Sequence, residues 1–273
     1  MPYKMMCIDM DGTLLNSKHV INEENIEAIK KATEKGVLIA VCTGRLFTSA
    51  AYFADLIGVK TPVIASNGAY IRDKNTDKVI YKSLLGNDNC NKIMNILRKY
   101  NIYPHFNSYD SIFTEKIVYS SEFYSRMNET LPRYRRIKIK LVENWENVFK
   151  EYEGEILKCI AIDQDIDKLK LAKMEMLKEE DLEVVSSWEN NFEVMQKGVS
   201  KGKAVNILAK HYSINREDII CIGDSENDLS MIKFAGLGIA MGNASDYIKK
   251  NSDYVTVTND ESGVAKAIYK FVL

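Results

Sequence analysis

Short apolar runs alternate with amphipathic stretches at both ends of the chain. This alternation predicts strand–helix–strand units, which build a parallel sheet. The apolar runs place the expected strands at residues 3–8, 37–42, 62–65, 219–222, 237–240 and 254–257. The amphipathic stretches place the expected helices at residues 23–35, 46–57, 201–212 and 227–234, with one more at the C-terminus. The two ends of the chain therefore predict an α/β domain.

The first of these helices has sequence signals at both of its ends. Asn22 is a favoured N-cap residue, and Glu23 and Glu24 place negative charge in the first turn. Gly36 is typical of the position just after a helix end. The prediction that follows is a helix bounded by Asn22 and Gly36.

The pattern changes after the third expected strand. Two short runs, 70–72 and 79–81, flank the turn-forming residues 73–77, which predicts a hairpin. Beyond it we expect helices near 88–100, 145–152 and 165–178, and strands near Ile112, Ile137, 156–162 and 182–186. In the third of these helices, Met174 is expected in the core and Met176 at the surface.

This middle set of elements interrupts the parallel pattern, so it is expected to form an inserted domain. The predicted domains are a core in two segments, residues 1–84 and 194–273, and an insertion at 85–193. A chain of 273 residues with 46% hydrophobic residues is long enough for a core domain and a smaller second one.

The charge balance narrows the choice of partners. Lys and Arg total 37 against 38 for Asp and Glu, a formal net charge of -1. The chain therefore has no global attraction for nucleic acid or for an anionic membrane, and a small soluble substrate fits better. The sequence leaves the oligomeric state open between a monomer and a small homo-oligomer.

The segments that would indicate membrane or secretory targeting are not found. No apolar run approaches the roughly 20 residues of a membrane span, and the opening apolar stretch meets Asp9 too early for a secretory signal. We expect a cytoplasmic protein. The five cysteines are odd in number and show no C-x-x-C spacing, which argues against disulfides or zinc. The cysteines expected to pack in the core are Cys7, Cys42, Cys159 and Cys221.

Four polar clusters follow the expected core strands or open a core helix. They are Asp9-Met10-Asp11-Gly12-Thr13, Thr43-Gly44-Arg45, Lys201, and Gly223-Asp224-Ser225-Glu226-Asn227-Asp228. Because the carboxyl ends of parallel strands line one crevice, these sequence-distant groups are expected to meet. Several carboxylates in one crevice repel each other unless a hard cation lies among them. Mg²⁺ is the expected ion, with Asp9, Asp11, Asp224 and a main-chain carbonyl as its candidate ligands.

Two of these carboxylates suit phosphoryl transfer. A carboxylate can attack phosphorus and form an aspartyl-phosphate, and we assign this nucleophilic role to Asp9. The leaving alkoxide needs a proton and the attacking water must lose one. A second carboxyl two residues along, Asp11, can serve both steps as general acid and base.

The transferred phosphoryl group also needs fixed hydrogen-bond donors for its oxygens. The candidate donors are the Met10 amide, the Thr43 hydroxyl, the Gly44 amide, the Lys201 ammonium and the Asn227 side chain. Gly12 and Gly44 let the backbone approach a ligand closely. These groups together predict a phosphate site.

With these residues in view, the chain resembles the haloacid dehalogenase superfamily, whose four ordered motifs the four clusters match. It looks most like the Cof-like phosphatases of subclass IIB. Further segments that resemble this subclass are Ser66-Asn67-Gly68-Ala69, Lys197-Gly198-Val199-Ser200-Lys201-Gly202 and Ala240-Met241-Gly242-Asn243-Ala244. The insertion between the second and third motifs also resembles that of the subclass in position and size.

The resemblance implies a Rossmann-like parallel-sheet core with a mobile inserted α/β cap domain of type C2B. It also implies dependence on Mg²⁺ and hydrolysis of phosphate esters through Asp9. Asp11 stands where a dehalogenase has a non-acidic residue, which favours a phosphatase. Asn67 is expected to support the site.

Two residues of the motifs keep alternative roles. Asp228 either ligates the metal or orients Lys201 and its own loop, and the supporting role is favoured. Arg45 either reaches the substrate or pairs with cap carboxylates. The basic stretch 133–140 is interpreted as a solvated cap strand rather than a nucleic-acid surface.

The function predicted from the sequence is a phosphatase for sugar phosphates or similar small phosphorylated metabolites. One alternative is a phosphosugar mutase, which passes phosphate between positions of one sugar. Another is a non-catalytic regulator that binds a phosphorylated metabolite. The substrate itself is not identified, because specificity is expected to reside in the cap.

Overall fold

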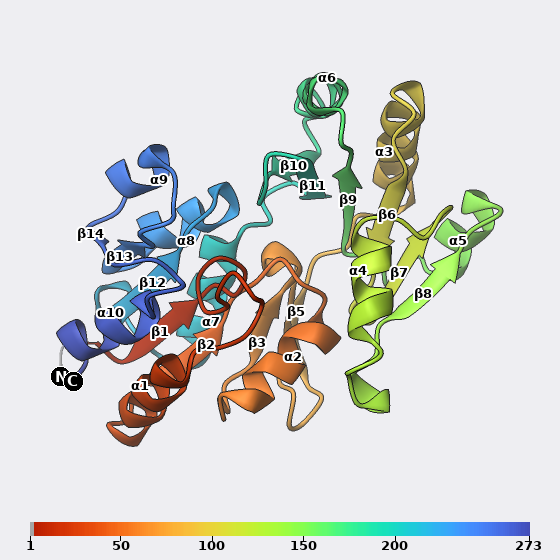
Figure 1. Ribbon diagram of the computed structural model, residues 1–273. Helices are drawn as coiled ribbons and strands as arrows, with labels where there is room; N and C mark the ends of the chain where they lie inside the picture. The colour runs from red at the N-terminus through yellow and green to blue at the C-terminus, as the bar shows by residue number, and fades with distance from the viewer. Residues whose placement is uncertain (1–2) are drawn as a thin grey trace. The chain divides into compact units, whose positions relative to one another are not determined.

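A five-stranded parallel sheet forms the centre of the first of two compact units. The computed structural model describes residues 3–273 (Figure 1). The strands of this sheet, in spatial order, are β14 (Tyr254–Val255), β13 (Leu237–Ala240), β12 (Ile219–Gly223), β1 (Met5–Ile8) and β2 (Leu38–Val41). Each neighbouring pair is parallel, which confirms the predicted α/β core.

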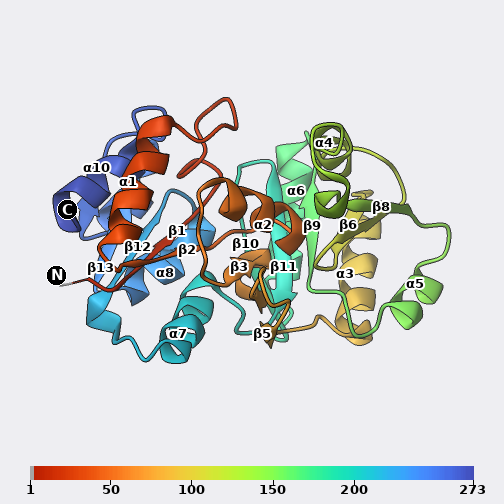
Figure 2. The same ribbon diagram turned by 90° about the horizontal axis from the view of Figure 1, so that it is seen from below.

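Helices cover both faces of this sheet. The helices that lie wholly or mainly in this unit are α1 (Glu23–Glu34), α2 (Phe47–Leu56), α7 (Lys201–His211), α8 (Leu229–Phe234), α9 (Asp246–Lys250) and α10 (Gly263–Phe271). The α1 and α10 helices pack together on one face, and α7 and α8 on the other (Figure 2). On α7, Ala204, Val205 and Leu208 are buried against strand residues such as Met5 and Cys7. Helix α9 was not predicted from the sequence.

The α1 helix begins and ends where the sequence predicted. Asn22 is its N-cap residue, and Gly36, with φ of 87°, lies just beyond its end. Within the described part of the chain, the Asn22 side chain accepts no capping hydrogen bond from the first turn of the helix. Its Nδ2 donates instead to the Asn259 carbonyl oxygen at 3.2 Å, so Asn22 joins the two core segments.

The third predicted strand forms but belongs to another sheet. The β3 strand (Val63–Ala65) pairs antiparallel with β4 (Tyr70–Arg72), and β5 (Val79–Lys82) adds on beyond β4. The predicted hairpin is thus confirmed. A single parallel bridge between Cys42 and Ile64 connects β3 with the end of β2.

The second compact unit comprises Arg45–Ser49 and Lys82–Val199. Its sheet has the order β10 (Leu182–Val185), β11 (Asn191–Gln196), β9 (Lys158–Ile162), β6 (Pro104–Asn107), β7 (Ser111–Thr114) and β8 (Lys138–Leu141). Its helices are α3 (Asn87–Lys99), α4 (Ser120–Met127), α5 (Trp145–Glu151) and α6 (Ile166–Met176). The sequence did not predict β6, β11 or α4.

We propose that this unit is the inserted cap domain. The β11 strand pairs with β9 and β10 and continues to Gln196, and the second unit continues to Val199, so we propose that the insertion extends to about residue 199 and not only to 193. The predicted first core segment, 1–84, begins with two residues outside the described part of the chain. One face of the cap sheet is apolar, and Phe106, Phe113 and Phe192 lie there with side chains of α3, α5 and α6.

The predicted burial of the two methionines in α6 was wrong. Met176 is fully buried, whereas Met174 is 62% exposed. The buried face of α6 is formed by Leu169, Ala172 and Met176, which recur at three- and four-residue spacing. Met174 falls on the opposite side of the helix.

All five cysteines lie in the described part of the chain, where each is buried and free. The prediction that Cys7, Cys42, Cys159 and Cys221 pack in the core is confirmed. Burial raises the pKa of the Cys90 thiol to about 12, which keeps it protonated and unreactive at neutral pH. In residues 3–273, no helix has the length and apolar character needed to cross a bilayer.

Gly238 gives a test of how tightly the core sheet packs on α8. A Cβ atom at this position would lie 2.2 Å from the Ile232 carbonyl oxygen. Gly238→Ala is therefore expected to lower the free energy of unfolding by about 1–3 kcal/mol, measured by urea denaturation. Gly154→Ala is the control, because a Cβ there meets nothing within 4 Å. Equal stability of the two variants would contradict this packing.

His105 predicts a pH dependence of cap stability. It is fully buried on β6, and its Nε2 lies 3.0 Å from the Val118 carbonyl oxygen. Burial lowers the pKa of His105 to about 4, so the folded state resists its protonation. Its contribution to stability is complete above the unfolded pKa of about 6.5 and is lost as the pH falls towards 4.

The wild type is expected to lose about 3 kcal/mol more stability than His105→Gln between pH 7 and pH 4. Glutamine has an amide donor for the Val118 oxygen but does not titrate. Urea denaturation at several pH values measures the difference. Parallel curves for the two proteins would show that His105 is not the titrating group.

Candidate active site

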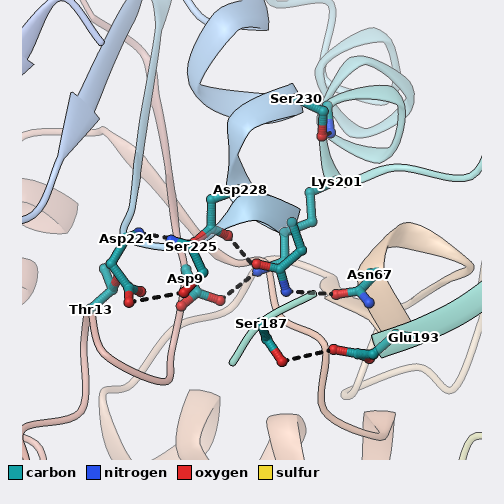
Figure 3. A network of polar contacts seen from close by, with 12 residues as sticks. Asp9, Thr13, Asn67, Ser187, Glu193, Lys201, Asp224, Ser225, Asp228 and Ser230 are labelled. Carbon is teal, nitrogen blue, oxygen red and sulfur yellow. Dashed lines mark hydrogen bonds and ion pairs between the residues drawn. The ribbon is translucent and has the colours of Figure 1, made fainter. Parts of the chain in front are cut away.

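The predicted site residues of the core lie at one edge of the parallel sheet. Asp9 follows β1, Thr43 comes two residues after β2, and Asp224 follows β12. Because these strands are parallel, their carboxyl ends point to the same edge. Lys201, the first residue of α7, extends into the group from the second core segment (Figure 3).

A buried ammonium lies at the centre of the site. Lys201 Nζ is 2.6 Å from Asp9 Oδ1 and 2.5 Å from Asp228 Oδ1. Neither Lys201 nor Asp228 is exposed to solvent. Burial alone would lower the pKa of Lys201, but the carboxylates of Asp228 and Asp9 raise it well above its usual range. The ammonium is therefore charged and bridges two carboxylates.

Both carboxylate oxygens of Asp228 have partners. Its Oδ1 accepts from Lys201 Nζ, and its Oδ2 accepts from the backbone amides of Asp224 and Ser225, each at 3.0 Å. This arrangement fixes the loop that carries Asp224. It favours the supporting role for Asp228 over direct metal ligation.

The Asp224 carboxylate is held by two hydroxyl groups. Thr13 Oγ1 donates to its Oδ1 at 2.9 Å, and Ser225 Oγ donates to its Oδ2 at 3.0 Å. Neither hydroxyl was predicted to have a role, although both residues stand inside the motifs of the site. Burial, and then the charge of Asp228, raise the pKa of Asp224 to about 7.

The crowding of carboxylates also affects Asp9. Burial and the charge of Asp228 raise the pKa of Asp9 well above its usual range, although Lys201 acts in the opposite direction. One oxygen each from Asp9, Asp224 and Asp228 lie within 4.8 Å of one another. A close set of carboxylate oxygens, in which the pKa values of Asp9 and Asp224 are raised, fits a hard divalent cation such as Mg²⁺.

Asp11 lies outside this close group of side-chain oxygens. Its carboxylate is partly exposed, and its Oδ1 is 4.0 Å from His19 Nδ1. The neighbouring Gly12 has φ of 79°, and a Cβ there would lie 2.4 Å from Asp224 Oδ2. Glycine is therefore required where the Asp11 loop passes the Asp224 carboxylate.

The predicted phosphate-binding residues Met10, Thr43, Gly44 and Asn227 belong to the same unit as Asp9. Met10 and Thr43 are buried. The Thr43 carbonyl oxygen accepts a hydrogen bond from the backbone N–H of Asn67 at 3.0 Å. Asn227 Nδ2 donates to Asn67 Oδ1 at 3.1 Å. The buried Asn227 Oδ1 has no hydrogen-bond partner among residues 3–273.

Asn67 belongs to a turn whose backbone strain the sequence pattern did not reveal. Ser66, Asn67 and Gly68 have φ of 51°, 55° and 93°, so three successive residues are left-handed. Such backbone costs about 1–3 kcal/mol for each non-glycine residue and is typical of functional sites. A Cβ at Gly68 would lie 2.4 Å from the Ser200 carbonyl oxygen, so the turn packs against the start of α7.

Arg45 belongs to the second unit, unlike the rest of its motif. Its guanidinium lies 5.5 Å from the centre of the Phe123 ring, and its Nη1 is 3.9 Å from Met127 Sδ. These two contacts with α4 were not predicted. The supporting role of Arg45 stays a prediction.

A polar cluster in the cap was also not predicted from the sequence. Lys158 on β9 forms a buried ion pair with Glu193 on β11, and Ser187 Oγ donates to Glu193 Oε1 at 3.1 Å. Asn107 on β6 is fully buried, and neither polar atom of its side chain has a hydrogen-bond partner in the described chain. Because β6 and β11 were not predicted, no pattern indicated that these residues meet.

Comparison with known proteins identifies the class. Residues 6–268 match the family model of haloacid dehalogenase-like hydrolases, so the chain belongs to this family. The resemblance found in the motifs is thereby confirmed.

The relatives include several phosphatases. The chain is 36% identical to the 5-amino-6-(5-phospho-D-ribitylamino)uracil phosphatase YwtE of Bacillus subtilis, and the match covers 96% of each protein. It is 34% identical to the phosphatase YwpJ of the same organism, covering 96% of this chain and 97% of that protein. It is 26% identical to the pyridoxal phosphate phosphatase YbhA of Escherichia coli over the full length of both.

Solved structures agree with the fold. A haloacid dehalogenase-like hydrolase from B. subtilis has a TM-score of 0.86 and 32% identity, covering 99% of this chain and 100% of that chain. The subclass IIB sugar phosphatase BT4131 has a TM-score of 0.78 and 26% identity, with 98% of each chain covered. The Rossmann-like core with a type C2B cap is therefore confirmed, and so is the prediction of a phosphoric monoester hydrolase.

Mg²⁺ binding provides a test of the acidic cluster that does not depend on activity. Mg²⁺ is expected to raise the melting temperature in a concentration-dependent manner, because an ion that binds only the folded state stabilises it. Asp224→Asn is expected to weaken Mg²⁺ binding at least about tenfold, since it removes one anionic ligand. Asp246→Asn is the control, because this exposed carboxylate lies at the start of α9. Equal Mg²⁺ affinities for both variants would exclude Asp224 as a ligand.

Proposed function

We propose that the protein is a Mg²⁺-dependent phosphatase that cleaves small phosphomonoesters through an aspartyl-phosphate on Asp9. The observation that carries the proposal is the buried contact of Lys201 with both Asp9 and Asp228, beside Asp224. A charged ammonium next to a carboxylate nucleophile suits the transfer of an anionic phosphoryl group.

The groups proposed to hold Mg²⁺ are the carboxylates of Asp9 and Asp224 and the main-chain carbonyl of Asp11, whose side chain stays available as acid and base. The ion would offset the negative charge of these carboxylates and of the phosphoryl oxygens, which favours the ionised nucleophile. Asp228 then serves to hold Lys201 and the Asp224 loop in place, a role that its three hydrogen bonds support.

In the first step, a carboxylate oxygen of Asp9 attacks phosphorus, and the bond between phosphorus and the ester oxygen breaks. Asp11, as the carboxylic acid, gives its proton to the departing alkoxide. In the second step, Asp11 takes a proton from the water that attacks the aspartyl-phosphate. Inorganic phosphate leaves, and the Asp9 carboxylate and the Asp11 acid are restored.

The phosphoryl oxygens are proposed to accept from Lys201 Nζ, the Thr43 hydroxyl, the Asn227 amide, and the backbone amides of Met10 and Gly44. The contact of Asn227 with Asn67 supports this role, because it fixes the amide beside the strained turn. Fixed donors of this kind stabilise charge in the transition state without reorganising.

The substrate is proposed to be a small metabolite, with selectivity residing in the cap. Two relatives with 36% and 34% identity are named 5-amino-6-(5-phospho-D-ribitylamino)uracil phosphatases, and one with 26% identity is named a pyridoxal phosphate phosphatase. A substrate panel should therefore begin with phosphorylated ribityl compounds and include pyridoxal phosphate and sugar phosphates.

Phosphate release tests the proposal directly. The wild type is expected to release phosphate from p-nitrophenyl phosphate and from a member of the panel in the presence of Mg²⁺. Asp9→Asn is expected to lower kcat by at least about a thousandfold, because it removes the nucleophile. Asp246→Asn is expected to retain wild-type rates.

Undiminished turnover by Asp9→Asn would rule out the covalent route. Formation of an isomeric phosphate with little free phosphate would point to a mutase instead. Tight binding across the panel without turnover would point to a non-catalytic regulator.

A further inference from the structure

Two asparagines from the last third of the chain, Asn243 and Asn259, form hydrogen bonds with the loop that carries Asp11. Asn243 follows β13, and its Nδ2 donates to the Gly12 carbonyl oxygen at 2.8 Å. The Asn243 Oδ1 accepts from the backbone amide of Asn259 at 3.0 Å. Asn259 Nδ2 in turn donates to the Leu15 carbonyl oxygen at 2.9 Å. The loop is therefore held at Gly12 and at Leu15 by two linked side chains.

The two contacts of Asn243 define the orientation of its amide. The Gly12 carbonyl can only accept and the Asn259 amide can only donate, so the nitrogen must face Gly12 and the oxygen must face Asn259. Both polar atoms of the Asn243 side chain thus form hydrogen bonds with main-chain groups. This pattern is typical of a positioning role.

A hydrogen bond to Gly12 restricts the loop at its most flexible residue. It lies between Asp11 and Thr13, and its φ of 79° is in a region that glycine enters and leaves at little cost. The same glycine must stay small because of the Asp224 carboxylate. A hydrogen bond to the Gly12 carbonyl restricts the peptide that immediately follows Asp11.

We propose that Asn243 is a positioning residue for ester cleavage, because it fixes the Gly12 peptide and thereby places the Asp11 carboxyl at the leaving group. This inference rests on the proposed function, in which Asp11 is the general acid. Asn243 touches neither the phosphoryl group nor the metal in this scheme. It acts only through the loop at residues 11–13.

The leaving group distinguishes this role from a general effect on folding. An alkoxide needs a proton as it departs, whereas p-nitrophenolate is stable enough to leave without one. Misplacing Asp11 should therefore slow the cleavage of an alkyl phosphate, such as glycerol phosphate, more than that of p-nitrophenyl phosphate. The informative quantity is kcat/KM, because it covers the steps up to transfer of the phosphoryl group to Asp9.

Asn243→Asp is the sharpest variant for this test. It has the same shape and keeps an acceptor for the Asn259 amide, but it loses the donor to the Gly12 carbonyl. The ratio of kcat/KM for the alkyl phosphate to that for p-nitrophenyl phosphate is expected to fall about tenfold. Asn243→Ala is expected to lower the ratio in the same direction.

Asn251→Ala is the matched control. The Asn251 side chain also donates to a backbone oxygen at 2.8 Å, but this oxygen belongs to Tyr247 in α9 and not to the loop at residues 11–13. Its ratio is expected to equal that of the wild type. Melting temperatures of all variants show whether any change in rate reflects loss of the folded protein.

Asp11→Asn separates failure of this inference from failure of the proposed function. If Asp11→Asn lowers the ratio and Asn243→Asp leaves it unchanged, the positioning role of Asn243 is wrong and the acid role of Asp11 stands. If Asp11→Asn leaves the ratio unchanged, both are wrong. If Asn243→Asp lowers kcat/KM by the same factor for both substrates, the positioning role of Asn243 is also wrong.

Discussion

The structure of the core depends on a charged ammonium that has no access to water. Removing the Lys201 charge from solvent costs several kcal/mol, and only close carboxylates offset that cost. Asp9 and Asp228 supply them at 2.6 and 2.5 Å. The three residues come from distant parts of the chain, so the same contacts that neutralise the charge also hold β1, α7 and the loop after β12 in one arrangement.

Close approach of backbone to side chains makes that arrangement possible. At Gly223, a Cβ would lie 2.5 Å from the Asp228 Cβ atom, and at Gly202, 2.3 Å from the Ser230 carbonyl oxygen. The carboxylates and Lys201 can therefore lie this close together only because positions 202 and 223 have no side chain. This explains physically why the acidic residues of these motifs stand next to glycines.

Sequence patterns predicted the core better than the cap, for a physical reason. Strands of the parallel sheet are buried on both faces and appear as plain apolar runs. The cap strand β6 contains Pro104, His105 and Asn107, whose burial depends on neighbours from other segments. In the site, strand ends predicted the meeting of Asp9 with Asp224. The left-handed turn at Ser66 and Asn67 has no such pattern, because tertiary contacts impose it.

The charge of the acidic cluster connects the structure with its proposed chemistry. Asp9, Asp224 and Asp228 contribute three negative charges and Lys201 one positive charge, which leaves minus two when all are ionised. Burial first, and then this excess of negative charge, raise the pKa of Asp9 and of Asp224. A phosphate monoester would bring further negative charge into the same space. A divalent cation balances the cluster, and Lys201 with the fixed amide and hydroxyl donors can then stabilise the incoming phosphoryl group.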